Sequence, residues 1–381
     1  MNFGLTSEQL AIRDHVKDLL DKECSLDYVA RCDEQGQPPR EAFKALADHG
    51  WLGLIAPEEY GGVSGSATDL AVLLEETGHH FEELGLWLFR SYTFGCYAIL
   101  KNGTPEQKKH FLPKTVSGAY TYAFALTEPD SGSDAAALRT KAEIDGDHFV
   151  INGRKQFISG FDIADYALVA LRTSQGAKKQ MGISTLLIDT KTPGIEAKRI
   201  PTLGQHSIGT TEVTFTNVRV PRSSLLGELD HGWAICEDTL RYERLCLSAA
   251  RIGAARQAFE FALDYAKNRI QFGKPIGSFQ AIQHKFADMK VMLDSAQTMV
   301  LRYAWLMEQG KAERGDTAVL KYLIGETYKS ISDQCLQVLG GYGYCNEYPM
   351  QRFFRDSRLA TIGGGTSEIQ KNIIAGSLGL K

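Results

Sequence analysis

One acidic residue, Glu243, lies where a carboxyl group could act as a base. In the helix predicted around residues 238–250 it falls on an apolar stripe, and a neighbouring stripe carries the charged side chains. The apolar stripe contains Cys236, Leu240, Glu243, Leu247 and Ala250, and the other contains Glu237, Arg241, Arg244 and Ser248. Burial raises the pKa of a carboxyl group towards neutrality, which suits a general base. A solvated position at the helix edge is the alternative, and the pattern alone leaves both open.

Two segments in the middle of the chain have the composition of a ligand-binding surface. In residues 124–134 a predicted strand runs into a loop of Pro, Gly, Ser and Asp, whose N–H groups and hydroxyls could approach an anion. In residues 155–160, Phe157 could stack on a flat ring while Ser159 bonds the ring edge. A plain strand-end turn and an ordinary half-buried strand are the alternatives. Neither G-x-G-x-x-G nor G-x-x-x-x-G-K-[ST] occurs, so neither standard nucleotide loop is present.

Three later segments combine glycines with polar residues at predicted helix ends. In residues 268–275, Arg269 could pair with a phosphate or compensate the helix dipole. Residues 337–343 end a helix at glycines, where a backbone could meet a ligand. Residues 362–370 lead a glycine loop into a helix whose N-terminus favours an anion, although Thr366 there also fits a simple helix cap.

The sequence predicts neither a metal site nor a serine nucleophile. His79 and His80 form the one histidine pair, and no cysteine or acidic partner is expected at metal-ligand spacing. The nucleophile elbow G-x-S-x-G is absent from the sequence.

The elements that must position these residues change in pattern twice along the chain. Residues 1–118 are predicted to form an N-terminal helical domain, residues 119–227 a middle β-barrel or sandwich, and residues 228–381 a C-terminal four-helix bundle. The predicted fold class is therefore α+β. The boundaries rest on changes of periodicity and on turn residues. The prediction therefore covers both where each domain begins and ends and which type of secondary structure it contains.

Local signals support each of the three zones. Thr6 to Gln9 and Thr104 to Gln107 read as capping boxes that open helices. Asp145-Gly146 and Asn152-Gly153 read as turn dipeptides between short strands. Apolar residues from 279 to 303 recur three and four residues apart, which predicts a helix packed against another helix.

Composition excludes several classes of protein. The 381 residues are 43% hydrophobic and 23% charged, which is ordinary for a globular chain and excludes disordered and collagen-like classes. A net charge of −4 provides no field to attract nucleic acid or an anionic membrane. Seven scattered cysteines without a C-x-x-C pair indicate buried thiols in a reducing compartment. Neither a signal segment nor an apolar run of 18 residues occurs, so we expect a cytoplasmic protein without a membrane span.

Taken together and in order, these segments resemble the acyl-CoA dehydrogenase family of flavoproteins over essentially the whole chain. The motifs that carry the resemblance are A-L-T-E-P-D-S-G-S-D at 125–134, R-K-Q-F-I-S-G at 154–160, N-R-I-Q-F-G-K-P-I at 268–276, Q-V-L-G-G-Y-G-Y at 337–344 and G-G-G-T-S-E-I-Q at 363–370. Each motif is weak alone, but five at the family's spacing make a strong signal. The predicted order of helices, strands and helices also matches the three-domain fold of that family.

The resemblance implies a non-covalent FAD between the β domain and the C-terminal bundle. One subunit would cradle the flavin with Phe124, Leu126, Thr127, Gly132, Ser133, Phe157 and Ser159. A neighbouring subunit would reach the FAD with Arg269, Phe272, Gln280, Gln337, Gly340 and Gly341, and Thr366 and Glu368 would contact the cofactor near the C-terminus. Sharing of the cofactor implies a homodimer, usually paired into a homotetramer.

The chain departs from the family pattern at the catalytic glutamate. Many members carry it in Y-E-G-T, where this sequence has Gly364 in G-G-G-T. A subset that includes isovaleryl- and long-chain-type enzymes places it on the helix with E-R-L, which matches Glu243 here. Gly364 still offers the N–H that binds the thioester oxygen in the family. The resemblance further implies substrate contacts from Ser133, Tyr242, Arg244, Gly364 and Gly365.

The implied reaction converts an acyl thioester to a trans-2-enoyl thioester, with the α-proton going to Glu243 and the β-hydride to the flavin. Electron-transfer flavoprotein is the usual acceptor, and oxygen serves oxidase-like members. The thioester carrier is either coenzyme A or an acyl carrier protein. Arg90, in a region that lines the acyl tail in relatives, is a candidate for a polar or anionic acyl end, although a surface arginine is the simpler interpretation.

Three other functions remain as alternatives. The first is a dehydrogenase or oxidase of a carrier-protein-bound acyl or aminoacyl group in a biosynthetic pathway. The second is a DNA-associated flavoprotein of the same fold, which would need a basic C-terminal surface that this acidic chain lacks. The third is a flavin monooxygenase relative, which would not need Glu243.

Overall fold

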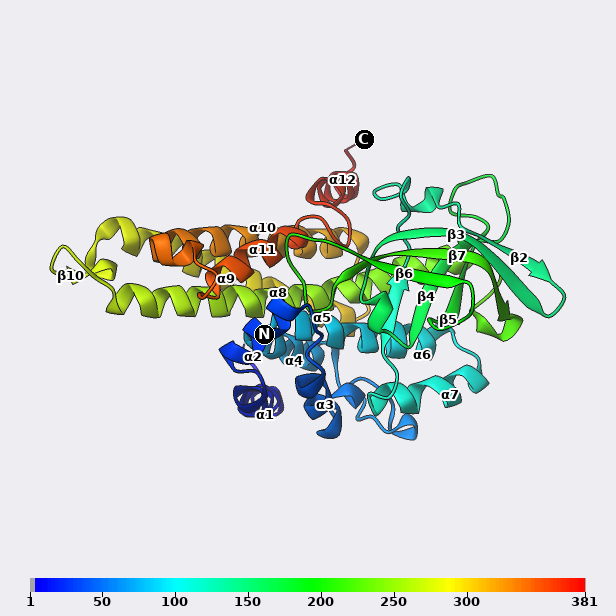
Figure 1. Ribbon diagram of the computed structural model, residues 1–381, viewed down its shortest axis with the longest axis horizontal. Coiled ribbons are helices and arrows are strands. Elements are labelled where there is room, and N and C mark those ends of the chain that lie inside the picture. The colour runs from blue at the N-terminus through cyan, green and yellow to red at the C-terminus, as the bar shows by residue number, and fades with distance from the viewer. Residues whose placement is uncertain (1–3, 381) are drawn as a thin grey trace. The chain divides into compact units, whose positions relative to one another are not determined.

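The chain forms helices, then strands, then helices, in the order shown in Figure 1. A computed structural model describes residues 4–380. The N-terminal helices are α1 (Ser7–Glu23), α2 (Leu26–Gln35), α3 (Arg40–Asp48), α4 (Ala67–His80), α5 (Glu82–Arg90), α6 (Ala98–Asn102) and α7 (Pro105–Val116). The strands that follow are β1 (Tyr122–Ala125), β2 (Lys141–Asp145), β3 (His148–Ser159), β4 (Tyr166–Arg172), β5 (Ile183–Asp189), β6 (Ile195–Ile200), β7 (Thr210–Pro221) and β8 (Leu225–Leu226).

The C-terminal part is helical again apart from one short hairpin. Its elements are α8 (Gly232–Asn268), β9 (Ile270–Gln271), β10 (Lys274–Pro275), α9 (Gln280–Glu308), α10 (Arg314–Leu339), α11 (Met350–Ala360) and α12 (Ser367–Ser377). This order of helical, β and helical parts confirms the predicted α+β fold class. The boundaries predicted after residues 118 and 227 stay predictions.

The described residues form two compact units, and each draws on separate stretches of the chain. The helical unit consists of residues 4–33, 66–86 and 244–380. The sheet unit consists of residues 34–65 and 87–243. Helix α8 belongs to both, because its residues up to Glu243 are part of the sheet unit and the rest, from Arg244 on, are part of the helical unit.

The sheet unit is built around one mixed sheet of eight strands. The strand order is β6-β7-β3-β2-β4-β5-β8, and β1 pairs in parallel with β4, so Phe124 lies opposite Leu168. The long antiparallel pair β3 and β7 runs side by side across the sheet in Figure 1. One buried cluster, which includes Phe149, Val169 and Phe215, forms the core beneath these strands. Burial of such apolar surface is the main term that stabilises the sheet.

The dipeptide Asn152-Gly153 is not a turn, and that prediction is wrong. Both residues lie inside β3, where the pairing with β7 shifts in register between Ile151 and Gly153. Gly153 has φ +146°, and a Cβ there would lie 2.6 Å from the side chain of Thr140. Gly153 therefore allows a bulge and a close approach of another segment to the strand. A glycine at such a bulge looks the same in the sequence as a glycine in a turn. The other predicted turn, Asp145-Gly146, does connect β2 to β3.

In the helical unit, the predicted apolar seam of α9 is buried. Its buried residues are Phe286, Met289, Leu293, Ala296, Val300, Tyr303, Ala304 and Leu306. Phe259 of α8 meets Phe286 of α9 edge to face, with ring centroids 5.6 Å apart. Both predicted capping boxes are confirmed, because the N-cap and N3 residues of α1 and α7 exchange both hydrogen bonds.

A π-helical segment, Ser91–Tyr97, interrupts the N-terminal helices between α5 and α6. Six of its seven residues are buried. Segments of this type are rare and occur often near functional sites, because one extra residue per turn redirects the side chains that follow. No sequence signal predicted it.

All seven cysteines are free, and six of them are buried, which agrees with the expectation of unpaired thiols. Cys345 is the exposed one. Across residues 4–380, none of the helices combines the length and the apolar character needed to cross a membrane.

Candidate functional site

A buried ion pair anchors the loop that follows β1. The Nζ atom of Lys155 donates to the Leu126 carbonyl at 3.1 Å and to Glu128 Oε1 at 2.8 Å. The two Glu128 oxygens also accept from the backbone N–H groups of Arg139 and Thr140. Burial alone would raise the pKa of the Glu128 carboxyl, but Lys155 and these donors bring it below its ordinary value. Every oxygen of the buried carboxylate is therefore partnered, and the loop has one fixed position.

Phe157 stands out from β3 beside this loop. Its ring is 62% exposed and its φ is +58°, because the pairing of β3 with β7 is interrupted between Lys155 and Ile158. The neighbouring Gln156 N–H donates to the Thr127 carbonyl at 2.8 Å, which ties the strand to the loop. An exposed aromatic ring is able to stack on a flat ring, and the stacking of Phe157 on the flavin stays a prediction.

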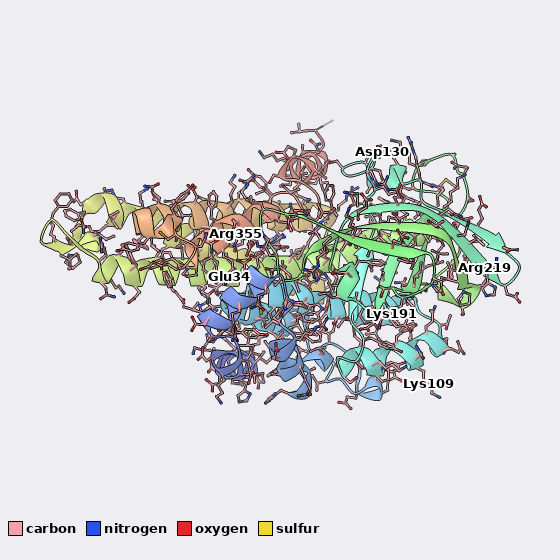
Figure 2. All side chains as sticks on the ribbon, viewed as in Figure 1. Glu34, Lys109, Asp130, Lys191, Arg219 and Arg355 are labelled. Carbon is pink, nitrogen blue, oxygen red and sulfur yellow. The ribbon has the colours of Figure 1, made fainter. Side chains whose placement is uncertain are left out.

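The loop itself offers polar atoms that the fold does not use. Ser131 is 2% exposed and its Oγ has no hydrogen-bond partner in the described chain. Gly132 and Ser133 are exposed, as is Asp130, which Figure 2 labels. A buried hydroxyl beside an exposed aromatic ring fits a cofactor with a flat ring and polar substituents. The residues present therefore fit FAD.

The remaining predicted flavin contacts on this side lie close to the same loop. Phe124 is half-buried and stacks on Phe94, with ring centroids 5.0 Å apart. Leu126 is buried in an apolar cluster that also contains Cys236 of α8. Thr127 and Ser159 are half-buried. Their contact with the flavin stays a prediction.

Glu243 is buried, with 9% of its surface exposed. The helix before it is held in place by Tyr242, whose ring stacks on Tyr97 of the π-helical segment with centroids 4.3 Å apart. Asp238, one turn earlier, accepts hydrogen bonds from Tyr97 at 2.9 Å and from Lys101 at 2.6 Å. Burial of Glu243 agrees with its place on the apolar stripe and excludes a solvated helix edge. The carboxyl group is therefore in a dry environment, which a general base requires.

A second group of predicted residues meets in the helical unit, at the glycine loop of residues 363–366. The Gly364 carbonyl accepts from Arg244 Nε at 3.3 Å and from Gln370 Nε2 at 3.2 Å. The Gly365 carbonyl accepts from Gln370 Nε2 at 3.1 Å and from Lys321 Nζ. The sequence analysis missed Gln370 and Lys321. The sequence did contain a signal for Lys321, because a lysine among the apolar residues of a helix can indicate a buried amine.

The residues that follow the glycine loop begin helix α12. Thr366 is the N-cap, and its Oγ1 accepts from the Ile369 N–H at 3.3 Å, so the helix-cap reading is correct. Glu368 is exposed in the first turn, where backbone and Thr366 donors lower the pKa of its carboxyl. Their contact with a cofactor stays a prediction.

Three other predicted residues of the helical unit line a pocket of about 570 Å³. Its lining includes Arg269, Gly340 and Gly341 together with Tyr342, whose ring centroid lies 5.3 Å from the Arg269 guanidinium. Phe272, 93% exposed with φ +52°, occupies the turn of the β9–β10 hairpin. The exposed Gln280 and Gln337 lie at the start of α9 and near the end of α10. Exposed aromatic and cationic side chains of this kind are typical of a surface that receives a ligand or a partner.

Two arginine and histidine expectations need correction. Arg90 is 5% exposed, so the interpretation as a surface arginine is wrong. Its Nη1 lies 3.3 Å from the point where a Cβ on Gly160 would sit. His79 and His80 do have acidic partners, since Nδ1 of each lies 3.7 Å from Glu76 Oε1. The expectation that the two histidines have no acidic partner is therefore wrong. Glu76 precedes them by three and four residues on the same helix, a spacing that brings side chains together.

The sequence matches three models of one family. The acyl-CoA dehydrogenase N-terminal domain matches residues 6–119, the middle domain residues 123–218 and the C-terminal domain residues 230–379. Two curated relatives cover nearly the whole chain. One is "Probable acyl-CoA dehydrogenase YngJ" of Bacillus subtilis (strain 168), 38% identical over 99% of this chain and 100% of its own. The other is "3-(aryl)acrylate reductase" of Clostridium sporogenes (strain ATCC 15579), 35% identical over 98% and 99%.

Solved structures agree with this assignment. The glutaryl-coenzyme A dehydrogenase glutaryl-CoA complex has a TM-score of 0.95 at 33% identity and covers 100% of this chain and 98% of its own. The FAD complex of PigA has a TM-score of 0.93 at 31% identity, with 100% of both chains covered. The prolyl acyl carrier protein oxidase AnaB has a TM-score of 0.92 at 28% identity over 99% of this chain and 100% of its own.

The chain therefore belongs to the acyl-CoA dehydrogenase family. It is an FAD-dependent oxidoreductase that acts on CH–CH bonds. The resemblance stated from the five motifs is confirmed, and so is the expectation of FAD.

Proposed function

We propose that this chain dehydrogenates an acyl thioester between its α and β carbons, with Glu243 as the base. The observation that carries the assignment of the base is the burial of Glu243 on α8, in a chain with glycine at position 364. Arg244, the next residue on α8, donates to the Gly364 carbonyl.

The geometry supports a division of work among the chain's own residues. A C–H beside a thioester carbonyl is a very weak acid, so the base must be desolvated and the developing oxyanion must meet a fixed donor. Glu243 would take the α-proton, and the Gly364 N–H would bind the thioester oxygen. Bound FAD supplies the acceptor for the hydrogen that leaves the β-carbon. Phe157 and the loop from Thr127 to Ser133 would hold the flavin ring.

Replacement of the base tests this proposal. Glu243→Gln keeps size and polarity but removes the proton acceptor, so anaerobic bleaching of the flavin by acyl-CoA should slow by about 10³-fold or more. FAD content should stay unchanged. Glu237→Gln, an exposed glutamate on the same helix, is the matched control and should bleach like the parent enzyme. Normal bleaching in Glu243→Gln would reject Glu243 as the base.

The FAD of one subunit is proposed to reach the pocket of a neighbouring subunit around Arg269, Gly340 and Gly341. The exposed Phe272 and the pocket around Arg269, both in the helical unit, support a homodimer, paired into a homotetramer, because exposed aromatic and cationic side chains are typical of a surface that receives a ligand or a partner. Sedimentation of the FAD-loaded protein tests the assembly. A monomer that retains FAD at micromolar concentration would contradict it.

The carrier of the thioester is proposed to be coenzyme A, with an acyl or aminoacyl carrier protein as the second candidate. The second is favoured by the similarity to the prolyl acyl carrier protein oxidase. Titration with a panel of acyl-CoAs and with loaded carrier proteins separates the two.

The proposed electron acceptor is electron-transfer flavoprotein, and oxygen is the acceptor in the oxidase alternative, which air-saturated turnover would reveal. A cytoplasmic location, consistent with seven free cysteines, completes the proposal.

Arg90 is proposed to select a polar or anionic acyl end. A buried guanidinium next to Gly160 could bind a carboxylate more strongly than an exposed one. Arg90→Ala should lower kcat/KM for a carboxylated thioester by about 10-fold or more relative to butyryl-CoA. An equal fall for both substrates would show that Arg90 serves only the fold.

A further inference from the structure

Side-chain donors hold the glycine loop of residues 363–366 through two of its carbonyls. Its two carbonyl acceptors, Gly364 and Gly365, receive donors from α8, α10 and α12 through Arg244, Lys321 and Gln370. These three donors from three helices hold the peptides 364–365 and 365–366, which carry the Gly364 and Gly365 carbonyls. In a trans peptide the N–H points away from the carbonyl, so the Gly365 N–H points away from its donors, and the Gly364 N–H belongs to the peptide directly before the held pair.

Those N–H groups are available for a ligand. Within residues 4–380, neither Gly364 nor Gly365 donates its N–H to another group of the chain. Their φ values are +69° and +89°, which glycine adopts at little cost and other residues do not. A Cβ on Gly365 would lie 2.6 Å from Gln370 Nε2, so the donor that holds the loop also leaves no room for a side chain. The half-buried loop thus carries two backbone donors that the described chain leaves unpaired.

Lys321 is the unusual member of the three donors. It is 2% exposed, yet within the described chain no carboxylate lies at ion-pair distance from its Nζ. The charged groups that face it are Arg251 and Arg244 of α8, Glu326 of its own helix and Glu368 of α12. Burial first and then the two guanidinium groups lower the pKa of Lys321 to about 7.

A buried amine without a carboxylate partner is costly to the fold, so its retention calls for a reason other than stability. Arg244 donates to the same loop, and the positive charges of Arg251 and Arg244 both make an ammonium at this position more costly. The one strong acceptor that Lys321 contacts is the Gly365 carbonyl. Its direct effect is therefore on the direction of the glycine loop.

We propose that Lys321 is a positioning residue of the reaction: through the Gly365 carbonyl it holds the glycine loop so that the Gly364 N–H faces the thioester oxygen. This rests on the proposed function, in which that N–H stabilises the oxyanion. Lys321 does not contact the substrate in this view and acts through the backbone. A misdirected donor weakens the transition state far more than it weakens substrate binding.

Lys321→Met removes the donor and keeps the length of the side chain, and Lys321→Arg restores a donor. Lys329→Met, on the same helix but partly exposed, is the matched control. We would measure FAD content, Kd for a product-like enoyl-CoA, and the limiting rate of anaerobic flavin bleaching from pH 6 to 9. A 3-thia-acyl-CoA, which can lose its α-proton but has no hydride to transfer, would report oxyanion stabilisation by its absorbance change at equilibrium. Hydrogen exchange of the peptide over residues 361–370 would report the loop directly.

The expected result is a limiting rate about 10- to 100-fold lower in Lys321→Met, with FAD content unchanged and Kd within about threefold. The 3-thia-acyl-CoA signal should fall with the rate, exchange in the loop should accelerate, and Lys321→Arg should recover most of both. Because the parent lysine loses its charge near pH 7, the ratio of parent to Lys321→Met rates should shrink as the pH rises through that value. Lys329→Met should match the parent in every measurement.

Other outcomes overturn the proposal. A parent-like rate and 3-thia-acyl-CoA signal in Lys321→Met would show that the loop needs no lysine. An equal loss in Lys321→Met and Lys329→Met would show a general effect on the fold. If Lys321→Met does not fold, Lys321→Arg decides: unaltered loop exchange with a lost rate contradicts positioning. If the parent bleaches with no acyl thioester, the proposed function fails, whereas the loop exchange still decides whether Lys321 holds the loop.

Discussion

Two buried lysines hold glycine-containing loops in the two units of the molecule, and they do so differently. In the sheet unit, Lys155 bonds the Leu126 carbonyl and has Glu128 as a charged partner. In the helical unit, Lys321 bonds the Gly365 carbonyl and is surrounded first by arginines. In the first arrangement the lysine is paired with a carboxylate, and it fixes the loop that we propose for the flavin. In the second arrangement the lysine has no carboxylate at ion-pair distance within the described chain, and the charge of Lys321 depends on pH.

The largest expected effect on stability comes from removal of the cation that pairs with Glu128. Lys155→Met leaves the Glu128 carboxylate buried without its cation, which should lower the free energy of unfolding by about 3–5 kcal/mol. Urea unfolding of the FAD-free protein measures this. The double variant Lys155→Met with Glu128→Gln should regain part of the loss, because no uncompensated charge then remains. A single variant as stable as the parent would show that the two lysines do not differ in this way.

At Lys321 the expected change in the free energy of unfolding is smaller for each step of one pH unit, and it depends on pH. The pKa of Lys321 is about 7 in the folded chain and about 10.5 when unfolded, so the unfolded chain binds more protons between these values. The cost of the buried amine is greatest below pH 7, and the contribution of Lys321 to stability rises with pH by up to about 1.4 kcal/mol per unit in this window. Lys321→Met should remove that slope. Unfolding of parent and variant from pH 6.5 to 10 tests the sign, and an unchanged difference across the range would contradict it.

The smallest effect is expected for an exposed pair near the same cofactor loop. Lys179 and Asp134 form an ion pair whose side chains are 62% and 57% exposed. Lys179→Met should change the free energy of unfolding by less than about 0.5 kcal/mol, since water and salt screen such pairs. The same unfolding assay measures it. A loss as large as that of Lys155→Met would mean that burial does not separate the two kinds of lysine.

The sequence predicted the parts of this molecule that depend on local signals. The capping boxes at Thr6 and Thr104 and the apolar seam of α9 follow from spacing along one helix, and all three are present. Asn152-Gly153 was misread because glycine serves a bulge as well as a turn. The short strands β2, β6 and β8 were missed, since their residues are mostly exposed or few and carry no alternating pattern.

For the site, motif resemblance located the loops but not what holds them. Glu243 could be found from the sequence because it is an acidic residue on a helix stripe whose other residues are apolar. Lys155 and Lys321 could not be assigned a role, because their partners Leu126, Glu128 and Gly365 are backbone or side-chain groups far away in sequence. A lone lysine is usually a solvated residue, and only tertiary structure shows that it is dry.

The exposed Cys345 gives the molecule a natural handle. It lines the same pocket as Arg269 and Gly341, while the other six thiols are shielded by the fold. A bulky maleimide should therefore label the native chain at a single atom, without any engineering. The speed of that labelling would report whether the pocket is open or covered, so a fluorescent dye at Cys345 could follow cofactor loading and subunit association in real time.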